Sequence, residues 1–215
     1  MKNPCRRVLA SLALVACCAH AQTPEQALFR AIGDGDLPEF TRLVDEGIHV
    51  SAKNDLSETP LYVAAEKGNL DMVKLLLARG ADARARTPNG ETVLHAASMI
   101  DFTALSKALI DAGAEVNRAN QDGETPLFWA AMTGTLQAVI ALADAGADLD
   151  AQAANGNTAL HAAASHDDVV LAQYLLSKNV RTDIRNSGGA TALELARALR
   201  RRAVVSVLEK QGVRE

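Results

Sequence analysis

The residues of this sequence that could carry chemistry are histidines, serines and carboxylates, and they are few. Beyond residue 22 the histidines are His49, His95, His161 and His166. An imidazole can act as a general base or bind a metal ion, but either role needs partner groups at a suitable spacing. The sequence contains no HExxH motif, no paired CxxC motif and no glycine-rich phosphate loop. His161 and His166 lie five positions apart, so one helix face would not present both. The histidines therefore predict no metal centre.

Serines and paired carboxylates give no better candidate for catalysis. A nucleophilic serine needs an adjacent base and a third group that orients the base. Neither Ser98 nor Ser165 shows this arrangement in the sequence. Asp167 and Asp168 are expected to begin a helix, where the helix dipole favours negative charge. We predict no catalytic residue and no cofactor. An enzyme would need a histidine–carboxylate site that the sequence does not reveal.

The elements that must hold these residues repeat with a period of 33 residues. A threonine recurs at this interval, and Gln26 stands one period before the first: Thr59, Thr92, Thr125, Thr158 and Thr191. The third position of each unit is leucine and the sixth is alanine, from Leu28 and Ala31 to Leu193 and Ala196. Residues three apart share a helix face, and alanine lets a neighbouring helix approach closely. Such short units must stack to bury their apolar faces.

Local signals divide each unit into two helices and a loop. Thr59–Pro60 and Thr125–Pro126 place a hydroxyl at the N-cap and proline at the first helical position. A second apolar segment, with its own recurring leucine, ends where a left-handed residue is favoured. The residues there are Gly47, Gly80, Gly113, Gly146, Asn179 and Gly212. A glycine also precedes most threonines by two positions, which indicates a tight turn: Gly90, Gly123, Gly156 and Gly189.

The pattern resembles the ankyrin repeat, whose units of 33 residues open with TPLHxAA. The matching segments here include "TPLYVAAEKGNLDMVKLLLARGADARARTPNG", "GETVLHAA", "GETPLFWAA" and "GNTALHAA". The resemblance implies an all-α solenoid of about six helix-turn-helix units with projecting hairpin-like loops. The units would span approximately 26–58, 59–91, 92–124, 125–157, 158–190 and 191–215, the last being a C-terminal cap. It also implies that His95 and His161 brace the loops through hydrogen bonds.

The end units and one middle unit depart from the pattern. The first and last units carry charges that suit a stack with one face in water: Arg30, Asp34, Glu39, Arg42, Arg197, Arg202 and Glu209. Unit 92–124 has Asp101 where glycine is usual between the helices, which predicts a local distortion. The last unit is basic, with Arg197, Arg200, Arg201, Arg202, Lys210 and Arg214. This charge indicates either a dock for an acidic partner or membrane surface, or a solvated cap at a helix terminus that suits cations. We favour the solvated cap.

The first 21 residues have the layout of a bacterial secretory signal peptide. A basic start is followed by a short apolar run, VLASLALVAC, and by the small-residue pattern AHA at residues 19–21. Cleavage after Ala21 would leave a domain of residues 22–215 in the periplasm. The segment LVAC also resembles the lipobox of bacterial lipoproteins, so Cys17 could instead become a lipid-anchored first residue. We favour cleavage after Ala21, because only a short spacer separates Cys17 from the first repeat.

Charge and cysteine content narrow the classes of partner. All three cysteines lie in the leader, so the mature chain would contain no disulfide. Removing Lys2, Arg6 and Arg7 from the 22 basic residues leaves 19 against 26 acidic ones, a net charge of −7. Such a chain is a poor candidate for binding nucleic acid or anionic lipid. We therefore expect no nucleic acid partner, membrane contact only through a lipidated Cys17, and a monomer.

What remains for function is the exposed surface that varies between units. In the resembled family partners bind along the concave side, and the matching positions here are Asp55, Leu56, Glu58, Glu66, Lys67, Asn89, Glu91, Met99, Ile100, Gln121, Asp122, Glu124, Met132, Asn155, Asn157 and His166. Trp129 is added as either an interface anchor or a packing residue. We predict a non-enzymatic module that binds a protein partner in the periplasm. The alternatives are an immunity or inhibitor protein against a periplasmic toxin or hydrolase, a structural part of an envelope assembly, or an unrecognised enzyme.

Overall fold

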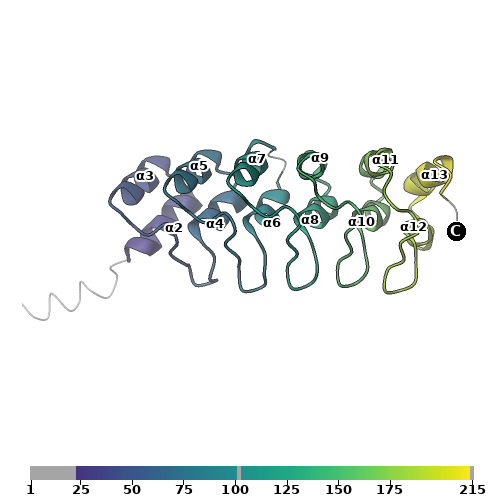
Figure 1. The fold of residues 1–215 in the computed structure, drawn as a ribbon, viewed down its shortest axis with the longest axis horizontal. Coiled ribbons are helices and arrows are strands. Elements are labelled where there is room, and N and C mark those ends of the chain that lie inside the picture. The colour runs from purple at the N-terminus through teal and green to yellow at the C-terminus, as the bar shows by residue number, and fades with distance from the viewer. Residues whose placement is uncertain (1–22, 101–102, 214–215) are drawn as a thin grey trace, which may run out of the picture.

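Two layers of short helices run side by side along an elongated stack, with a row of loops projecting from one layer (Figure 1). The computed structural model describes residues 23–100 and 103–213, and within these ranges it contains helices and no named strand. The layer beside the loops, called here the inner helices, consists of α2 (Pro24–Asp34), α4 (Pro60–Glu66), α6 (Val93–Ser98), α8 (Pro126–Thr133), α10 (Ala159–His166) and α12 (Ala192–Ala198). The outer helices are α3 (Leu37–Asp45), α5 (Leu70–Ala78), α7 (Thr103–Asp111), α9 (Leu136–Asp144), α11 (Val169–Ser177) and α13 (Arg202–Lys210).

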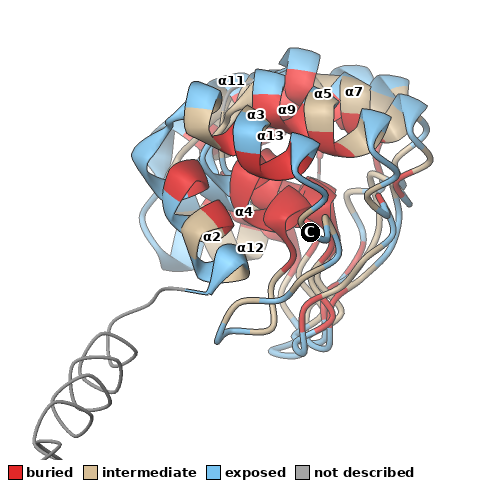
Figure 2. Ribbon diagram, turned by 90° about the vertical axis from the view of Figure 1, so that its left-hand side faces the viewer, coloured by how far each residue is buried: buried red, intermediate tan, exposed pale blue. Residues whose placement is uncertain are grey.

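The repeating residues form the predicted core. The leucine at the third position and the alanine at the sixth are buried in all six units, from Leu28 and Ala31 to Leu193 and Ala196. Figure 2 shows the buried residues gathered where the inner helices face the outer ones, while the loop tips are exposed. Each helix is too short to be stable by itself, so packing against neighbouring units supplies the stability.

The predicted helix signals are confirmed where they were placed. The Thr59 and Thr125 hydroxyls accept hydrogen bonds from the backbone N–H groups of Tyr62 and Phe128, each at 3.2 Å, and proline occupies the first helical position. The residues predicted to be left-handed after the outer helices all have positive φ, from 58° at Asn179 to 90° at Gly113. These local signals succeed because each depends on residues adjacent in the chain.

Asp167 does not begin the outer helix as the sequence analysis expected. It is the C-cap of α10, with φ 58°, and only Asp168 is the N-cap of α11, where its carboxylate accepts from the Leu171 N–H at 2.9 Å. Asp167 occupies the place that glycine holds at Gly68 and Gly134. Its carboxylate instead reaches the next unit, where it accepts a hydrogen bond from the Val204 N–H at 2.9 Å.

The expectation that the C-terminal arginines lie at a helix terminus suited to cations is also wrong for two of them. Arg201 is the N-cap of α13 and Arg202 is its first residue. The N-terminus of a helix carries the positive end of the dipole and disfavours cations. Arg197, in the last turn of α12, does lie at a favourable helix end and forms an ion pair with Glu209 at 2.8 Å.

The middle unit is shortened at its first helix. α6 contains six residues, whereas α4 contains seven and α8 eight. The carbonyl of Ser98 at the end of α6 accepts a hydrogen bond from the Thr135 hydroxyl of the next unit at 2.7 Å. Asp101, the residue that predicted a distortion here, lies outside the described residues, as do the leader with Cys17 and the C-terminal Arg214.

Candidate protein interface

The projecting loops, called here fingers one to five, comprise residues 52–58, 85–91, 118–124, 151–157 and 184–190. An asparagine near the base shapes three of them. In the first finger the Asn54 Oδ1 atom accepts from the backbone N–H groups of Leu56 at 3.0 Å and Glu58 at 2.9 Å. Asn120 and Asn186 do the same in fingers three and five. The side chain therefore satisfies backbone donors that a tight turn leaves without a partner.

Neighbouring fingers are joined by backbone hydrogen bonds at their tips. The N–H groups of Gln121, Ala154 and Ser187 donate to the carbonyls of Asn89, Asp122 and Asn155 at 2.9, 2.7 and 2.9 Å. These bonds link fingers two to five into a ladder. The corresponding donor in finger two would be residue 88, which is Pro88 and has no N–H. Among the described residues, no backbone hydrogen bond joins the tips of fingers one and two.

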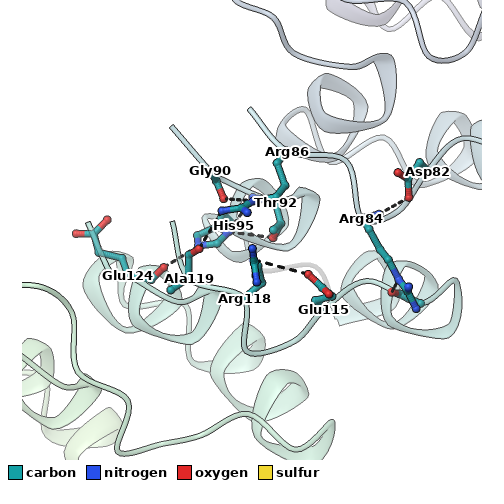
Figure 3. Close-up of polar contacts among 11 residues, drawn as sticks. Asp82, Arg84, Arg86, Gly90, Thr92, His95, Glu115, Arg118, Ala119 and Glu124 are labelled. Carbon is teal, nitrogen blue, oxygen red and sulfur yellow. Dashed lines mark hydrogen bonds and ion pairs between the residues drawn. The ribbon is translucent and has the colours of Figure 1, made fainter. Parts of the chain in front are cut away.

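Two buried histidines fasten the inner helices to the finger that follows, as the family resemblance implied. The His95 Nδ1 atom accepts from the backbone N–H of Thr92 at 2.9 Å, which leaves Nε2–H to donate to the Glu124 carbonyl at 3.0 Å (Figure 3). His161 repeats the arrangement with Thr158 and Ala190. Desolvation by burial lowers the pKa of both histidines, more than the hydrogen bonds to backbone carbonyls raise it. Both side chains are thus structural and neutral.

The acidic residue just before the threonine braces its finger and is not a free charge at the tip. Glu58, Glu91 and Glu124 are all half-buried. The Glu91 carboxylate accepts from the Thr87 hydroxyl at 3.0 Å and from the hydroxyl of Tyr62, on the inner helix of the same unit, at 3.2 Å. The Glu58 carboxylate accepts from Asn54 Nδ2 at 2.7 Å. These glutamates, predicted as partner-binding residues, are engaged inside the chain.

Asn157 is likewise half-buried, and its Oδ1 atom accepts from Asn186 Nδ2 at 3.0 Å. It therefore connects two fingers. Ile100 is half-buried as well and packs toward the preceding unit, since a Cβ atom added to Gly68 would lie 3.0 Å from Ile100 Cδ1. Of the predicted partner-binding positions, Asn157 and Ile100 thus face neighbouring units.

The structure shows a packing role for Trp129, one of the two roles that the sequence left open. Its indole Nε1–H donates to the Glu124 carboxylate at 2.7 Å, and its ring meets His95 edge to face, with centroids 5.1 Å apart. The side chain is half-buried on α8. Hydrogen bonding and ring packing hold the indole in one orientation, which is the condition for a preorganised binding contact.

The inner helices expose a short apolar strip at the middle of the stack. Met99 at the end of α6 is 40% exposed, and Met132 on α8 is 43% exposed. They occupy the same position of successive units, so stacking places them next to each other. Glu66 and Lys67 are exposed on one side of this strip, and His166 on the other.

Six predicted finger positions are exposed at the surface. Leu56, 70% exposed, lies at the tip of the first finger, and the others are Asp55, Asn89, Gln121, Asp122 and Asn155. The structure therefore exposes an apolar strip on the inner helices and a mostly polar row of finger tips.

Long side chains that support the fingers were missed in the sequence analysis. Arg86 donates to the Gly90 carbonyl of its own finger at 3.1 Å and to the Ala119 carbonyl of the next at 3.4 Å (Figure 3). Gln152 bonds in the same way to Gly156 and to Arg185. Both residues occupy the same position of their units, and this shared position was the available signal.

No described residues form a cluster of three or more histidine, cysteine or carboxylate groups that could hold a metal ion. His166 Nδ1 lies 3.0 Å from the Ala162 carbonyl and 3.1 Å from the Ser165 hydroxyl.

Within the described ranges, no helix combines the length and apolar character needed to cross a bilayer.

Comparison with known families agrees with the geometry. A family model described as ankyrin repeats (3 copies) matches residues 79–153 and 138–214. A second, described as ankyrin repeats (many copies), matches residues 43–97. A search of curated proteins gave no significant match.

Proposed function

Because the chain belongs to the ankyrin repeat family, we propose that it is a non-enzymatic module that binds a protein partner across the finger tips and the exposed flank of the inner helices. Ankyrin repeats are protein-interaction scaffolds, and their fold requires only that the buried positions repeat. The observation that carries the proposal is the pair Met99 and Met132, exposed beside the half-buried Trp129 at the middle of the inner layer. Methionine and tryptophan are enriched at the centres of protein interfaces.

The chemistry of this surface suggests the chemistry of its partner. The apolar strip would receive one or two apolar side chains, while Asp55, Glu66 and Asp122 supply exposed negative charge around it. Polar rims of this kind mainly set specificity and association rate. We infer a partner that presents an apolar group within a basic surface.

A photo-crosslinking experiment tests the surface. A benzophenone amino acid is placed at Met132, and at Gln173 on the outer helix α11 as a matched exposed control. We expect adducts with one discrete protein from position 132 and none with that protein from position 173. A Met99→Asp substitution should abolish the adduct at 132 without unfolding the chain. Adducts from position 173 alone, or adducts at 132 that Met99→Asp leaves intact, would place the interface elsewhere.

An immunity or inhibitor function is the second candidate, because the free carboxylates could cover the basic rim of a toxin or hydrolase. Its test reverses Asp55, Glu66 and Asp122 to lysine and leaves Glu58, Glu91 and Glu124 in place, since these brace the fingers. Loss of protection against the cognate enzyme is expected. Full protection by the reversed variant would exclude this surface from the inhibitory contact.

We also propose a periplasmic location, supported by the signal-peptide layout of residues 1–21. Mass spectrometry of the mature chain distinguishes the two routes of export. An N-terminus at Gln22 supports cleavage after Ala21, and a lipid-modified Cys17 supports anchoring. A mature chain that retains Met1 would contradict both.

A further inference from the structure

Three consecutive arginines lie at the C-terminal end of the stack. Arg200 and Arg201 lie between α12 and α13, Arg202 begins α13, and all three are exposed. Among the described residues, none of their guanidinium groups forms a hydrogen bond or an ion pair. Arg200 has φ 59°, a left-handed conformation that glycine adopts more easily and that Gly68 and Gly134 supply in other units. Local structure therefore does not account for this run of charge.

The two ends of the stack carry opposite charge. A groove at the N-terminal end, between α2 and α3, is lined by three carboxylates, one arginine and two alanines: Asp34, Asp36, Glu39, Arg30, Ala27 and Ala31. A groove at the C-terminal end, between α12 and α13, is lined by three arginines, one glutamate, a valine and a serine: Arg197, Arg200, Arg202, Glu209, Val205 and Ser206. The ends lie at opposite extremes of the long axis, so they cannot meet within one chain (Figure 1).

The contacts between internal units show how such ends would fit together. A Cβ atom on Gly68, the tenth residue of its unit, would lie 3.0 Å from Ile100, the ninth of the next. One on Gly134 would lie 3.8 Å from the carboxylate of Asp168, the eleventh residue of the next unit. The tenth residue of a unit therefore faces the ninth and eleventh of the unit that follows.

The same register extends to the fourteenth residue. Asp167, the tenth residue of its unit, accepts a hydrogen bond from the N–H of Val204, the fourteenth of the next. Each tenth residue thus lies against the ninth, eleventh and fourteenth residues of the following unit.

At the C-terminal end the tenth residue is Arg200, and in the first unit the ninth, eleventh and fourteenth are Asp34, Asp36 and Glu39. If one copy continued the stack of another in this register, Arg200 would face three carboxylates, two of which also pair with arginines of their own helices, Asp34 with Arg30 and Glu39 with Arg42. We propose that copies of this chain associate end to end, the basic C-terminal end of one docking on the acidic N-terminal end of the next through Arg200 and its flanking arginines.

The proposed contact is heterologous and leaves one end of each kind free, so it extends the stack without closing a ring. Charged end units normally end a solenoid by keeping its last face in water. Here the charges on the two ends are of opposite sign and in matching positions. The proposal replaces the monomer expected from the sequence with a weak, salt-dependent assembly, because exposed ion pairs are screened by salt.

Sedimentation velocity of the purified protein over a range of concentrations tests the association. At about 0.01 M salt, where the Debye length is about 30 Å, we expect the average mass to rise above that of the monomer with concentration. At about 1 M salt, where the Debye length is about 3 Å, only the monomer is expected. Monomer mass at every concentration in low salt would overturn the proposal.

The Arg200→Gly variant separates association from folding. It restores the glycine found at Gly68 and Gly134 and removes strain, so the thermal midpoint should not fall. The association constant should fall by about fivefold, the loss of one exposed charge pair. Arg118→Gln, which removes an exposed arginine from the middle of the stack, is the matched control and should leave association unchanged. Equal association by Arg200→Gly and wild type would contradict the assigned contact.

Reciprocal charge reversal tests the register. One variant carries Arg200→Glu and Arg202→Glu, and the other carries Asp34→Lys and Glu39→Lys. Each has ends of like charge and should remain monomeric alone, whereas a mixture of the two should associate, with alternating copies. Retention of the far-ultraviolet circular dichroism spectrum shows that both are folded. A mixture of folded variants that stays monomeric at low salt would disprove the pairing of these ends.

Discussion

The Asp167 carboxylate accepts a hydrogen bond from the backbone N–H of Val204 at 2.9 Å, although the residues stand 37 positions apart. Val204 is the third residue of α13, and its amide is the one that an N-cap side chain ordinarily satisfies. In α5 and α11 the N-cap residues Asn69 and Asp168 do this within their own units. The side chain of Arg201, the N-cap residue of α13, contains no hydrogen-bond acceptor. Asp167 therefore caps the last helix from the preceding unit.

Removing this cap should destabilise the C-terminal end. Asp167→Ala is expected to lower the free energy of unfolding by about 1 kcal/mol in urea titrations, a common cost of losing an N-cap. Arg201→Asp supplies a local acceptor and should recover most of that loss in the double variant. Asp168→Ala, which removes the cap of α11, is the control that Arg201→Asp should not rescue. Additive effects of Asp167→Ala and Arg201→Asp would mean that the two residues do not share the cap.

Acidification should weaken the fold through its buried histidines. Burial lowers the pKa of His95 and His161 in the folded chain below the usual 6.5, while the unfolded chain keeps the usual value. The unfolded state therefore binds more protons as the pH falls below about 6.5. The contribution of the neutral imidazoles to the free energy of unfolding is fully present above that pH. It is lost as the pH falls toward the pKa values of the histidines in the folded chain.

Urea unfolding of wild type and His161→Phe between about pH 7.5 and pH 5.5 measures this effect. Phe128 holds the equivalent position in another unit, so phenylalanine fits there. We expect a shallower fall in stability for the variant, because its side chain does not titrate. An identical pH dependence in the two proteins would show that His161 titrates alike in the folded and unfolded states.

The gap in the ladder of finger tips should be repairable. Pro88→Gln gives residue 88 an N–H opposite the Leu56 carbonyl, as Gln121 has opposite Asn89. Amide hydrogen exchange should then slow at the tip of finger one. Ala154→Pro makes the opposite change, removing the bond to the Asp122 carbonyl at a cost of about 1 kcal/mol. Unchanged exchange in finger one of Pro88→Gln would indicate that the missing N–H is not what separates fingers one and two.

Because fingers four and five approach closely at Gly156, a substitution of this glycine should destabilise the fold more than a substitution of an open turn glycine. A Cβ atom on Gly156 would lie 2.8 Å from both Asn186 Cα and Ser187 N, whereas one on Gly146 would meet nothing within 4 Å. Both have positive φ, so alanine costs about 1 kcal/mol at either position. Gly156→Ala should lower the free energy of unfolding by a further ~1–3 kcal/mol, because the added methyl group overpacks against the backbone of finger five. Equal losses for the two variants in urea titrations would show that the fingers separate easily.

The location of the candidate interface could be predicted from the sequence only in part. Periodicity located the exposed positions, and Met99, Met132, Leu56 and the tip residues are indeed at the surface. It could not distinguish a free carboxylate from an engaged one. The Glu91 carboxylate accepts a hydrogen bond from Tyr62 on the inner helix of its own unit, and the Glu124 carboxylate accepts one from Trp129, five residues later. These contacts depend on how a finger folds back on a helix, which no single position in the repeat reveals.

The sequence by itself determined the number of units, their helices, their turns and the residues of the core, because these follow from signals adjacent in the chain and from a period of 33 residues. The tertiary structure alone decided which residues meet across units, such as Asp167 with Val204 and Arg86 with Ala119. The physical reason is that a hydrogen bond depends on distances of about 3 Å between atoms. Those distances are set when one unit packs on the next, and Asp167 or Arg200 looks like any other surface charge until that packing exists.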